Sequence, residues 1–221
     1  MKEDKEKKQK EKLEAEIARL KIMQEFEEKY KAFNYIAGVD EVGRGPLAGP
    51  VVASCVILDR NIQILYINDS KKLSEKKRES LYDEICEKSV AYGIGIVSPG
   101  RIDEINILNA TYEAMKAAIS SLDIKPDILL NDAVHIPDLD IKQVSIIKGD
   151  AKSISIAAAS IVAKVSRDRL MVEYDTIYPE YKFAKNKGYG TKEHISAIKE
   201  HGLCPIHRRS FVGNIIGADG E

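Results

Sequence analysis

Two adjacent acids, Asp40 and Glu41, stand at the end of an apolar, β-branched run over residues 35–42, and a turn rich in glycine and proline follows them. Burying a carboxylate there is costly unless it is paired or bound to a metal ion. Because neighbouring side chains on a regular strand point to opposite faces, both acids can share a site only if the strand end twists. The glycines at positions 43 and 45 permit that distortion.

Three interpretations compete for this stretch. A dinucleotide-binding loop is excluded by context, because Pro46 and Pro50 interrupt it and a strand follows where the phosphate-binding helix should begin. A tight hairpin whose acids merely cap and pair is the second interpretation. The third is a metal site, which needs further carboxylates from elsewhere in the chain.

Further carboxylates follow two other predicted strands. Asp132 comes just after the apolar run 127–130, and Asp150 follows the run 144–147. Ligand sites in open α/β sheets form at strand ends. Acids gathered there would repel one another and raise their pKa values, and a hard cation such as Mg²⁺ or Mn²⁺ would relieve that repulsion. The pattern favours the metal site without excluding the hairpin.

Apolar runs bounded by turn residues predict strands over residues 35–42, 50–58, 62–67, 90–97, 127–130 and 144–147. Helices are predicted from Ser74 to about residue 88, over residues 102–122, from Ser153 to about residue 178, and from Thr191 to residue 201. Small residues over 157–165 are expected to pack the third of these helices closely against the sheet. Short turns require antiparallel pairs and helical connections allow parallel ones, so we expect an α/β fold with a mixed sheet.

The first 32 residues differ from the rest of the chain, with 10 basic and 9 acidic residues. Apolar side chains recur at helical spacing at Leu13, Ile17, Leu20, Met23 and Tyr30. This pattern predicts a solvated helix that docks loosely at its far end. The alternative is a segment that grips a substrate or a partner.

Composition adds exclusions. The 34 basic and 35 acidic residues argue against a general polyanion binder. The three cysteines are scattered and suit neither a disulfide framework nor a zinc motif, and the histidines have no metal-ligand spacing. No apolar run approaches the ~20 residues that span a bilayer, and no signal peptide is visible, so we expect a cytoplasmic protein.

Several motifs, in order, resemble bacterial ribonuclease HII, the type 2 ribonuclease H. The resemblance covers about residues 35–211, and residues 1–32 lie outside it. One departure is Ala133, because a glycine commonly follows the acid at that point. The motifs are Gly38-Val-Asp-Glu-Val-Gly-Arg-Gly-Pro-Leu-Ala-Gly-Pro50, Asn68-Asp-Ser-Lys-Lys-Leu, Lys148-Gly-Asp-Ala-Lys-Ser, Ala157-Ala-Ala-Ser-Ile-Val-Ala-Lys-Val-Ser-Arg-Asp and Lys187-Gly-Tyr-Gly-Thr.

The resemblance implies a ribonuclease-H-like mixed five-stranded sheet flanked by helices, with a small helical C-terminal region. It divides the chain into a charged helical extension (1–32), a catalytic domain (33–178) and a substrate-binding region (179–221). It implies a monomeric endoribonuclease that cuts RNA–DNA hybrids and nicks 5′ of ribonucleotides in duplex DNA. The catalytic acids would hold two divalent ions, Mn²⁺ or Mg²⁺, about 4 Å apart. These acids are Asp40, Glu41, Asp132 and Asp150.

Substrate contacts also follow from the resemblance. Backbone groups of Gly43, Arg44 and Gly45 would contact the 2′-hydroxyl, which distinguishes RNA from DNA. Tyr189 would pack against the next sugar and read the RNA-to-DNA junction. Two alternatives remain open, a binding module without catalysis and a ribonuclease-H-like nuclease that acts on DNA. Expected phosphate contacts are Lys71, Lys72, Lys182, Lys185 and Lys187, with further backbone contacts from residues 207–209.

Overall fold

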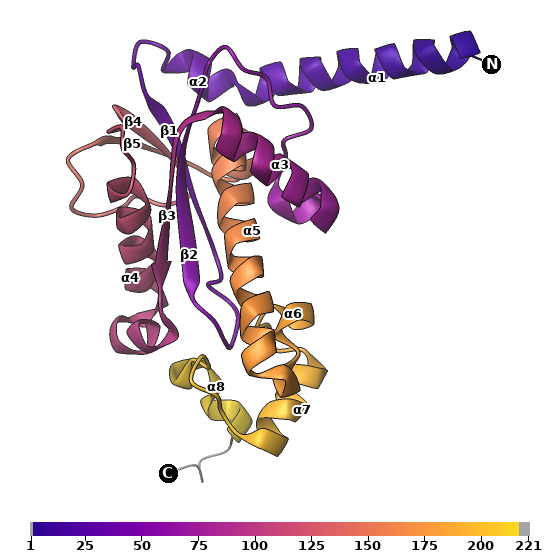
Figure 1. Cartoon of the computed structure of the whole chain (residues 1–221). Helices are drawn as coiled ribbons and strands as arrows, with labels where there is room; N and C mark the ends of the chain where they lie inside the picture. The colour runs from indigo at the N-terminus through magenta and orange to yellow at the C-terminus, as the bar shows by residue number, and fades with distance from the viewer. Residues whose placement is uncertain (1, 217–221) are drawn as a thin grey trace.

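The sheet is built outward from β1 (Ile36–Val42), the strand that carries the paired acids, in a computed structural model that describes residues 2–216 (Figure 1). The strand order is β3-β2-β1-β4-β5. β2 (Val51–Leu58) pairs antiparallel with β1 and with β3 (Ser89–Val97). β4 (Ile128–Asp132) runs parallel to β1, and β5 (Lys142–Ile146) runs parallel to β4. The predicted mixed five-stranded sheet is confirmed, and the carboxyl ends of β1, β4 and β5 lie at one edge.

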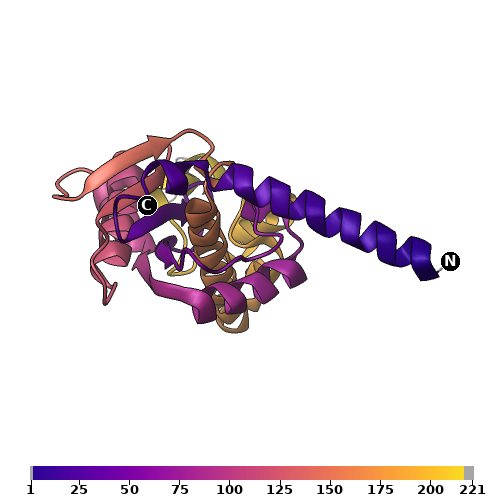
Figure 2. The same ribbon diagram turned by 90° about the horizontal axis from the view of Figure 1, so that it is seen from above.

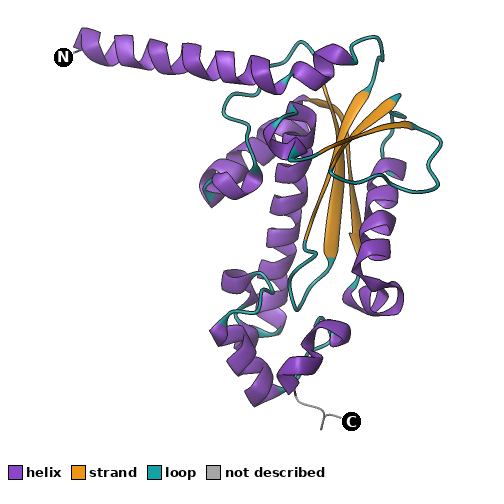
Figure 3. Ribbon diagram, turned by 180° about the vertical axis from the view of Figure 1, so that it is seen from behind, coloured by secondary structure: helices purple, strands orange, loops and turns teal. Residues whose placement is uncertain are grey.

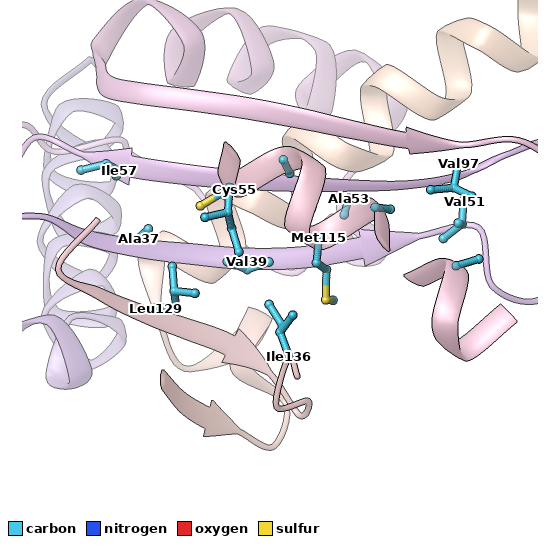
Figure 4. Close-up of a cluster of buried hydrophobic side chains, with 14 of the residues drawn as sticks. Ala37, Val39, Val51, Ala53, Cys55, Ile57, Val97, Met115, Leu129 and Ile136 are labelled. Atoms are coloured by element: carbon cyan, nitrogen blue, oxygen red, sulfur yellow. The ribbon is translucent and has the colours of Figure 1, made fainter. Parts of the chain in front are cut away.

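Alternation along the central strands gives each face of the sheet its own core. Ala37, Val39 and Cys55 are fully buried in the cluster beneath α4 (Pro99–Ser120), as the close-up in Figure 4 shows. Val56 belongs instead to the cluster formed with α3 (Glu75–Lys88) and α5 (Ile154–Ile177). Because side chains alternate along a strand, β1 presents Gly38 and Asp40 to the α5 face. Asp40 therefore lies between the sheet and the longest helix.

α5 lies unusually close to β1. A Cβ atom added at Gly38 would lie 2.0 Å from the backbone carbon of Ser155, so only glycine fits there. Ala157, Ala158 and Ala159 on this helix are completely buried. The predicted role of the small-residue run is confirmed, since it allows the helix to approach the strand that carries the acids.

Helix starts follow the predicted capping residues. The side-chain oxygens of Ser74, Ser153 and Thr191 each accept a hydrogen bond from the backbone N–H three residues later. α4 begins at Pro99, earlier than predicted, because Ser98 caps it and proline suits the first helical position. This helix is kinked at Asn106, whose φ is 66°.

Residues 62–67 are not a strand, and that prediction is wrong. Ile64 and Ile67 are buried beside α3 and α5, but both edges of β2 are already paired with β1 and β3. The apolar residues of this run therefore indicate that it is buried, and not that it pairs with a strand. Side chains of the N-terminal helix bind backbone groups of this run instead. Arg19 donates to the carbonyl of Ile67 at 2.6 Å, and Glu16 accepts from the N–H of Tyr66 at 2.6 Å.

The N-terminal extension forms α1 (Lys2–Met23) and α2 (Glu25–Lys29), and α1 projects far from the body of the protein (Figures 1 and 2). Its predicted docking end is confirmed, with Leu20 and Met23 buried and Leu13 exposed. The docking is firmer than expected. The Glu27 carboxylate accepts hydrogen bonds from the Ser153 hydroxyl at 2.6 Å and the Ser155 N–H at 3.0 Å, at the start of α5.

The C-terminal region packs at the opposite end of the sheet from α1 (Figure 3). It contains η3 (Pro179–Tyr181), α6 (Phe183–Asn186), α7 (Lys192–His201) and α8 (Arg209–Ile216). These elements share a separate apolar cluster that includes Phe183, Ile198 and Val212. Two short 3₁₀ helices lie nearer the sheet, η1 (Ser70–Lys72) and η2 (Gly149–Ala151). Within residues 2–216 no helix combines the length and the apolar character that a membrane span requires.

Candidate active site

The end of β1 places Asp40 and Glu41 in a buried, electrostatically unfavourable position. The Glu41 N–H donates to Asp40 Oδ1 at 2.8 Å. Burial raises the pKa of Asp40 well above its usual value, and the charges of Glu41 and Asp132 raise it further. Burial also raises the pKa of Glu41, while Arg44, with its guanidinium 3.4 Å from the carboxylate, opposes that rise. The strand end thus holds two carboxyl groups whose ionised forms would be stabilised by a bound cation.

The other two acids come from the neighbouring parallel strands. Asp132 ends β4, and its Oδ1 accepts from the Gly149 N–H at 2.7 Å, which ties it to the 3₁₀ turn carrying Asp150. Burial raises the pKa of Asp150, followed by repulsion from Asp69 and Asp132, whereas Lys71 lowers it. The sheet edge therefore brings all four predicted acids into one electrostatic neighbourhood, because the charge of Asp132 acts on each of the other three.

The donor set fits a hard divalent cation, because it offers carboxylate oxygens, and burial together with neighbouring carboxylates raises the pKa values of Asp40 and Asp150. Over residues 2–216, however, no three His, Cys, Asp or Glu side chains are already arranged to hold a metal ion. Backbone N–H groups occupy one carboxylate oxygen of Asp40 and one of Asp132. The acids lie near one another but are not arranged as a coordination shell.

The glycine turn after β1 is held by two buried arginines whose role the sequence did not predict. Arg208 donates to the carbonyl oxygens of Gly43 at 2.5 Å, Arg44 at 3.0 Å and Gly49 at 2.8 Å. Arg167 on α5 donates to those of Pro50 at 2.9 Å, Ala48 at 3.1 Å and Lys187 at 2.9 Å. The two guanidinium groups thus connect the turn, α5 and the C-terminal region.

This arrangement corrects the prediction for residues 207–209. His207 and Arg208 are buried, so they cannot contact a phosphate backbone, and Arg209 alone of the three is exposed. Burial lowers the pKa of Arg208 to about 9 and that of Arg167 to about 10. A charged residue in a sequence is most often on the surface, which is why Arg208 was misassigned.

Tyr189 lies beside the glycine turn. The residue is 45% exposed, and its Cε1 atom is 3.9 Å from the place where a side chain at Gly45 would begin. The preceding residue fixes this position, because the Gly188 carbonyl accepts from the Leu47 N–H at 2.8 Å. The predicted 2′-hydroxyl reader and the predicted junction reader are therefore neighbours in space, although they are far apart in the sequence.

The predicted lysines differ in their surroundings. Lys71, Lys72 and Lys182 are exposed, and Lys72 lies 3.9 Å from Asp69. Lys185 forms an ion pair with Glu193 at 2.9 Å, and the Lys187 amine donates to the Ala184 carbonyl at 2.6 Å. The phosphate contacts proposed for these lysines stay predictions.

Three polar residues near the acids were also missed. A hydrogen bond from Ser160 on α5 opposes the rise in the pKa of Asp40, and the Ser160 hydroxyl lies 2.9 Å from that of Ser70. Asp69 contributes a fifth negative charge near Asp150. Ser70 and Asp69 stand in the Asn68-Asp-Ser-Lys-Lys motif, which was the available signal.

Comparison with known proteins decides the family. A sequence model of ribonuclease HII matches residues 37–213. The chain belongs to the ribonuclease HII family. It is 66% identical over 205 residues to ribonuclease HII of Lachnoclostridium phytofermentans, covering 93% of this chain and 81% of that protein. It is 61% identical over 206 residues to ribonuclease HII of Caldanaerobacter subterraneus subsp. tengcongensis, covering 92% and 86%.

A solved structure agrees with the sequence relatives. The crystal structure of ribonuclease H2 from Pyrococcus horikoshii matches with a TM-score of 0.67 and 30% identity, over 82% of this chain and 97% of that one. The chain is therefore a ribonuclease H, a hydrolase that acts on the RNA strand of RNA–DNA hybrids. Enzymes of this family use divalent metal ions, in accord with the oxygen-donor neighbourhood at the sheet edge.

Proposed function

We propose that this ribonuclease HII cuts on the 5′ side of ribonucleotides, both in RNA–DNA hybrids and where a single ribonucleotide is embedded in duplex DNA, leaving 3′-hydroxyl and 5′-phosphate ends. One observation carries the proposal. The carboxylates at the ends of three parallel strands lie next to a glycine turn that a buried arginine clamps and that an exposed tyrosine borders.

Asp40, Glu41, Asp132 and Asp150 are the proposed ligands for Mg²⁺ or Mn²⁺. These carboxylates would hold two such cations, whose chemistry when bound would be activation of a water for attack on phosphorus and stabilisation of the leaving oxygen. The acids contribute a charge that is only partly neutralised by the protein, since Arg44 is the cation that lowers the pKa of Glu41 and Lys71 the one that lowers the pKa of Asp150.

The glycine turn supplies the proposed recognition of ribose. Because a trans peptide is planar, a carbonyl that points at Arg208 directs the following N–H the other way. The carbonyls of Gly43 and Arg44 point at Arg208, so the N–H groups of Arg44 and Gly45 face away from it. These are the proposed donors to the 2′-hydroxyl, the group that DNA lacks.

Tyr189 and the predicted lysines complete the proposed substrate path. The Tyr189 ring would stack on the sugar beyond the ribonucleotide, beside the turn that reads the 2′-hydroxyl. The five predicted lysines would contact phosphates and fix the register of the duplex without reading bases. Lys187 is half-buried, and the other four are exposed. Residues 179–221 would thus act as a substrate-binding region. The three cysteines are free thiols, which accords with a proposed monomer in the cytoplasm.

The test uses duplex DNA that carries one ribonucleotide, with Mg²⁺ or Mn²⁺ present. The wild-type protein should nick 5′ of the ribonucleotide, and Asp40→Asn should not. A binding module without catalysis would bind the duplex without nicking it, and a DNA-directed nuclease would cut all-DNA duplex equally well. Either result overturns the proposal.

A second test addresses the tyrosine. Tyr189→Ala should change the ratio of cleavage at a single embedded ribonucleotide to cleavage of continuous RNA–DNA hybrid. An unchanged ratio would show that Tyr189 does not read the junction, whatever happens to the total rate.

A further inference from the structure

Two buried histidines form a pair in the C-terminal region, away from the acids. His194 lies on α7 and His207 precedes α8, and their Nε2 atoms are 3.0 Å apart. Both are almost wholly buried, with the rings of Tyr181 and Phe183 packed against them at centroid distances of 4.8 Å for Tyr181–His207 and 5.3 Å for Phe183–His194. The proposed activity assigns this pair no role.

Backbone groups at both ends fix the protons of the pair. The Cys204 N–H donates to His207 Nδ1 at 3.0 Å, so this nitrogen carries no proton. Neutral His207 is then protonated at Nε2 and donates to His194 Nε2. The proton of His194 therefore sits on Nδ1 and is donated to the carbonyl oxygen of Tyr189 at 2.9 Å. The result is a directed chain from Cys204 to Tyr189.

The chain ends on the backbone of the residue whose ring borders the glycine turn. The Tyr189 carbonyl also accepts from the Thr191 N–H at 2.8 Å, and the Tyr189 N–H donates to the Asn186 carbonyl at 2.9 Å. His194 is the side chain in this set, and it fixes the direction of the Tyr189 carbonyl. Loss of this hydrogen bond would allow the Tyr189 backbone to shift, and the ring it carries lies 3.9 Å from where a side chain at Gly45 would begin.

We propose that His194 is a positioning residue for Tyr189, and that His207 holds His194 in the tautomer that can donate to the Tyr189 carbonyl. The inference rests on the proposed junction-reading function of Tyr189. It adds that specificity depends on a buried hydrogen-bond chain that does not itself touch substrate.

The hydrogen-bond chain from Cys204 to Tyr189 cannot accept another proton without breaking one of its bonds. A proton on His194 Nε2 would face the N–H of His207 across 3.0 Å, and one on His207 Nδ1 would face the Cys204 N–H. Burial lowers the pKa of both histidines, and the charge of His194 lowers that of His207 further. The pair is therefore neutral, and the chain intact, at neutral pH.

The charged and titratable groups around the pair do not offset this. From η3, Tyr181 presents its ring, and burial, with a smaller contribution from Glu180, raises the pKa values of Tyr181 and Cys204. On α7, Glu193 forms its ion pair with Lys185, and the ring of His201 lies 6.4 Å from that of Tyr181. Arg208 donates to the glycine turn, and the Cys204 thiol lies 3.1 Å from His207 Nδ1.

Two substitutions at one position test the inference. The amide nitrogen of His194→Asn can take the place of Nδ1 and donate to the Tyr189 carbonyl, whereas that of His194→Gln reaches the place of Nε2 and cannot. The measured quantity is the ratio of cleavage at one embedded ribonucleotide to cleavage of continuous hybrid. His194→Gln should change this ratio about three- to tenfold, as the loss of one hydrogen bond would, and His194→Asn should restore most of it. His201→Gln, on the exposed side of the same helix, is the matched control.

A double variant separates positioning from a merely structural effect. In the Tyr189→Ala background His194→Gln should leave the ratio unchanged, because the residue it positions is gone. Wild-type protein should also lose its preference in acid, as the pH falls toward the His207 pKa of about 4, more steeply than His194→Asn. Equal ratios for His194→Gln and wild type, or a further change in the double variant, would overturn the inference. If wild-type protein does not nick the ribonucleotide at all, the proposed function fails instead.

Discussion

The acids at the sheet edge are buried or half-buried and the arginines behind the glycine turn are buried, but the two sets differ in how their charges are compensated. Burial and, to a lesser degree, neighbouring carboxylates raise the pKa values of Asp40, Glu41 and Asp150, which favours their neutral forms. Arg167 and Arg208 each donate to three backbone carbonyl oxygens, which offset much of the cost of burial. The carboxylates that repel one another mark the site where binding of a cation would be favourable. The arginines, which are hydrogen-bonded to backbone carbonyls, belong to the scaffold that fixes the shape of this site.

The largest expected effect comes from removing one charge from the acidic side. Asp40→Asn should lower the nicking rate by about 1,000-fold, the upper range for loss of a charge-stabilising group. It should also raise the unfolding temperature, measured without divalent ions. The folded-state pKa of Asp40 lies above its unfolded value, so ionisation destabilises the fold as pH rises above that unfolded value. A neutral amide removes this penalty. If Asp40→Asn unfolds at a lower temperature than wild type, the acids are not in repulsion.

The arginine side predicts the opposite response. Arg208→Lys keeps the charge but loses the planar group that reaches the carbonyls of Gly43, Arg44 and Gly49. Leaving buried carbonyls unpaired should lower the free energy of unfolding by about 2–3 kcal/mol, which corresponds to roughly 4–12 °C in Tm.

Arg209→Lys is the matched control for that substitution, because Arg209 is the next residue and its side chain is exposed. It should change the free energy of unfolding by less than about 0.5 kcal/mol. Equal effects of the two substitutions on the urea midpoint would show that Arg208 does not support the turn.

An intermediate effect is expected from pH. Burial lowers the pKa of His207 from 6.5 to about 4. Between pH 6.5 and 4, His207 is therefore protonated in the unfolded protein but not in the folded protein. The free energy of unfolding falls as pH drops through this range. His207→Gln, which cannot be protonated, should flatten this part of the profile. Urea unfolding at several pH values measures the slope, and parallel profiles for the two proteins would contradict the assignment.

The same contrast explains what the sequence could predict. Carboxylates at the ends of apolar strands are conspicuous, and the capping residues marked the helix starts, so the acidic neighbourhood and most of the fold were predicted. Residues 62–67 were misassigned because an apolar run reports burial and does not show which strand edges are free. Arg208 and the paired histidines depend on contacts between distant segments, and no local pattern records such contacts.

The smallest predicted effect concerns backbone strain on the acidic side. Ala133 follows Asp132 with φ at 56°, in the left-handed region where a side chain costs about 1–2 kcal/mol. Glycine avoids this cost but loses more conformational entropy on folding. Ala133→Gly should therefore raise the free energy of unfolding by about 0.5–1 kcal/mol, measured as a shift in the urea midpoint.

Ala18→Gly, on the exposed surface of α1, is the matched control, and it should be destabilising or neutral because the backbone there is helical. Destabilisation by Ala133→Gly would mean that the left-handed turn after Asp132 carries no strain. The unfavourable free energy at the acids would then come from burial and repulsion of the carboxylates, without a contribution from the backbone.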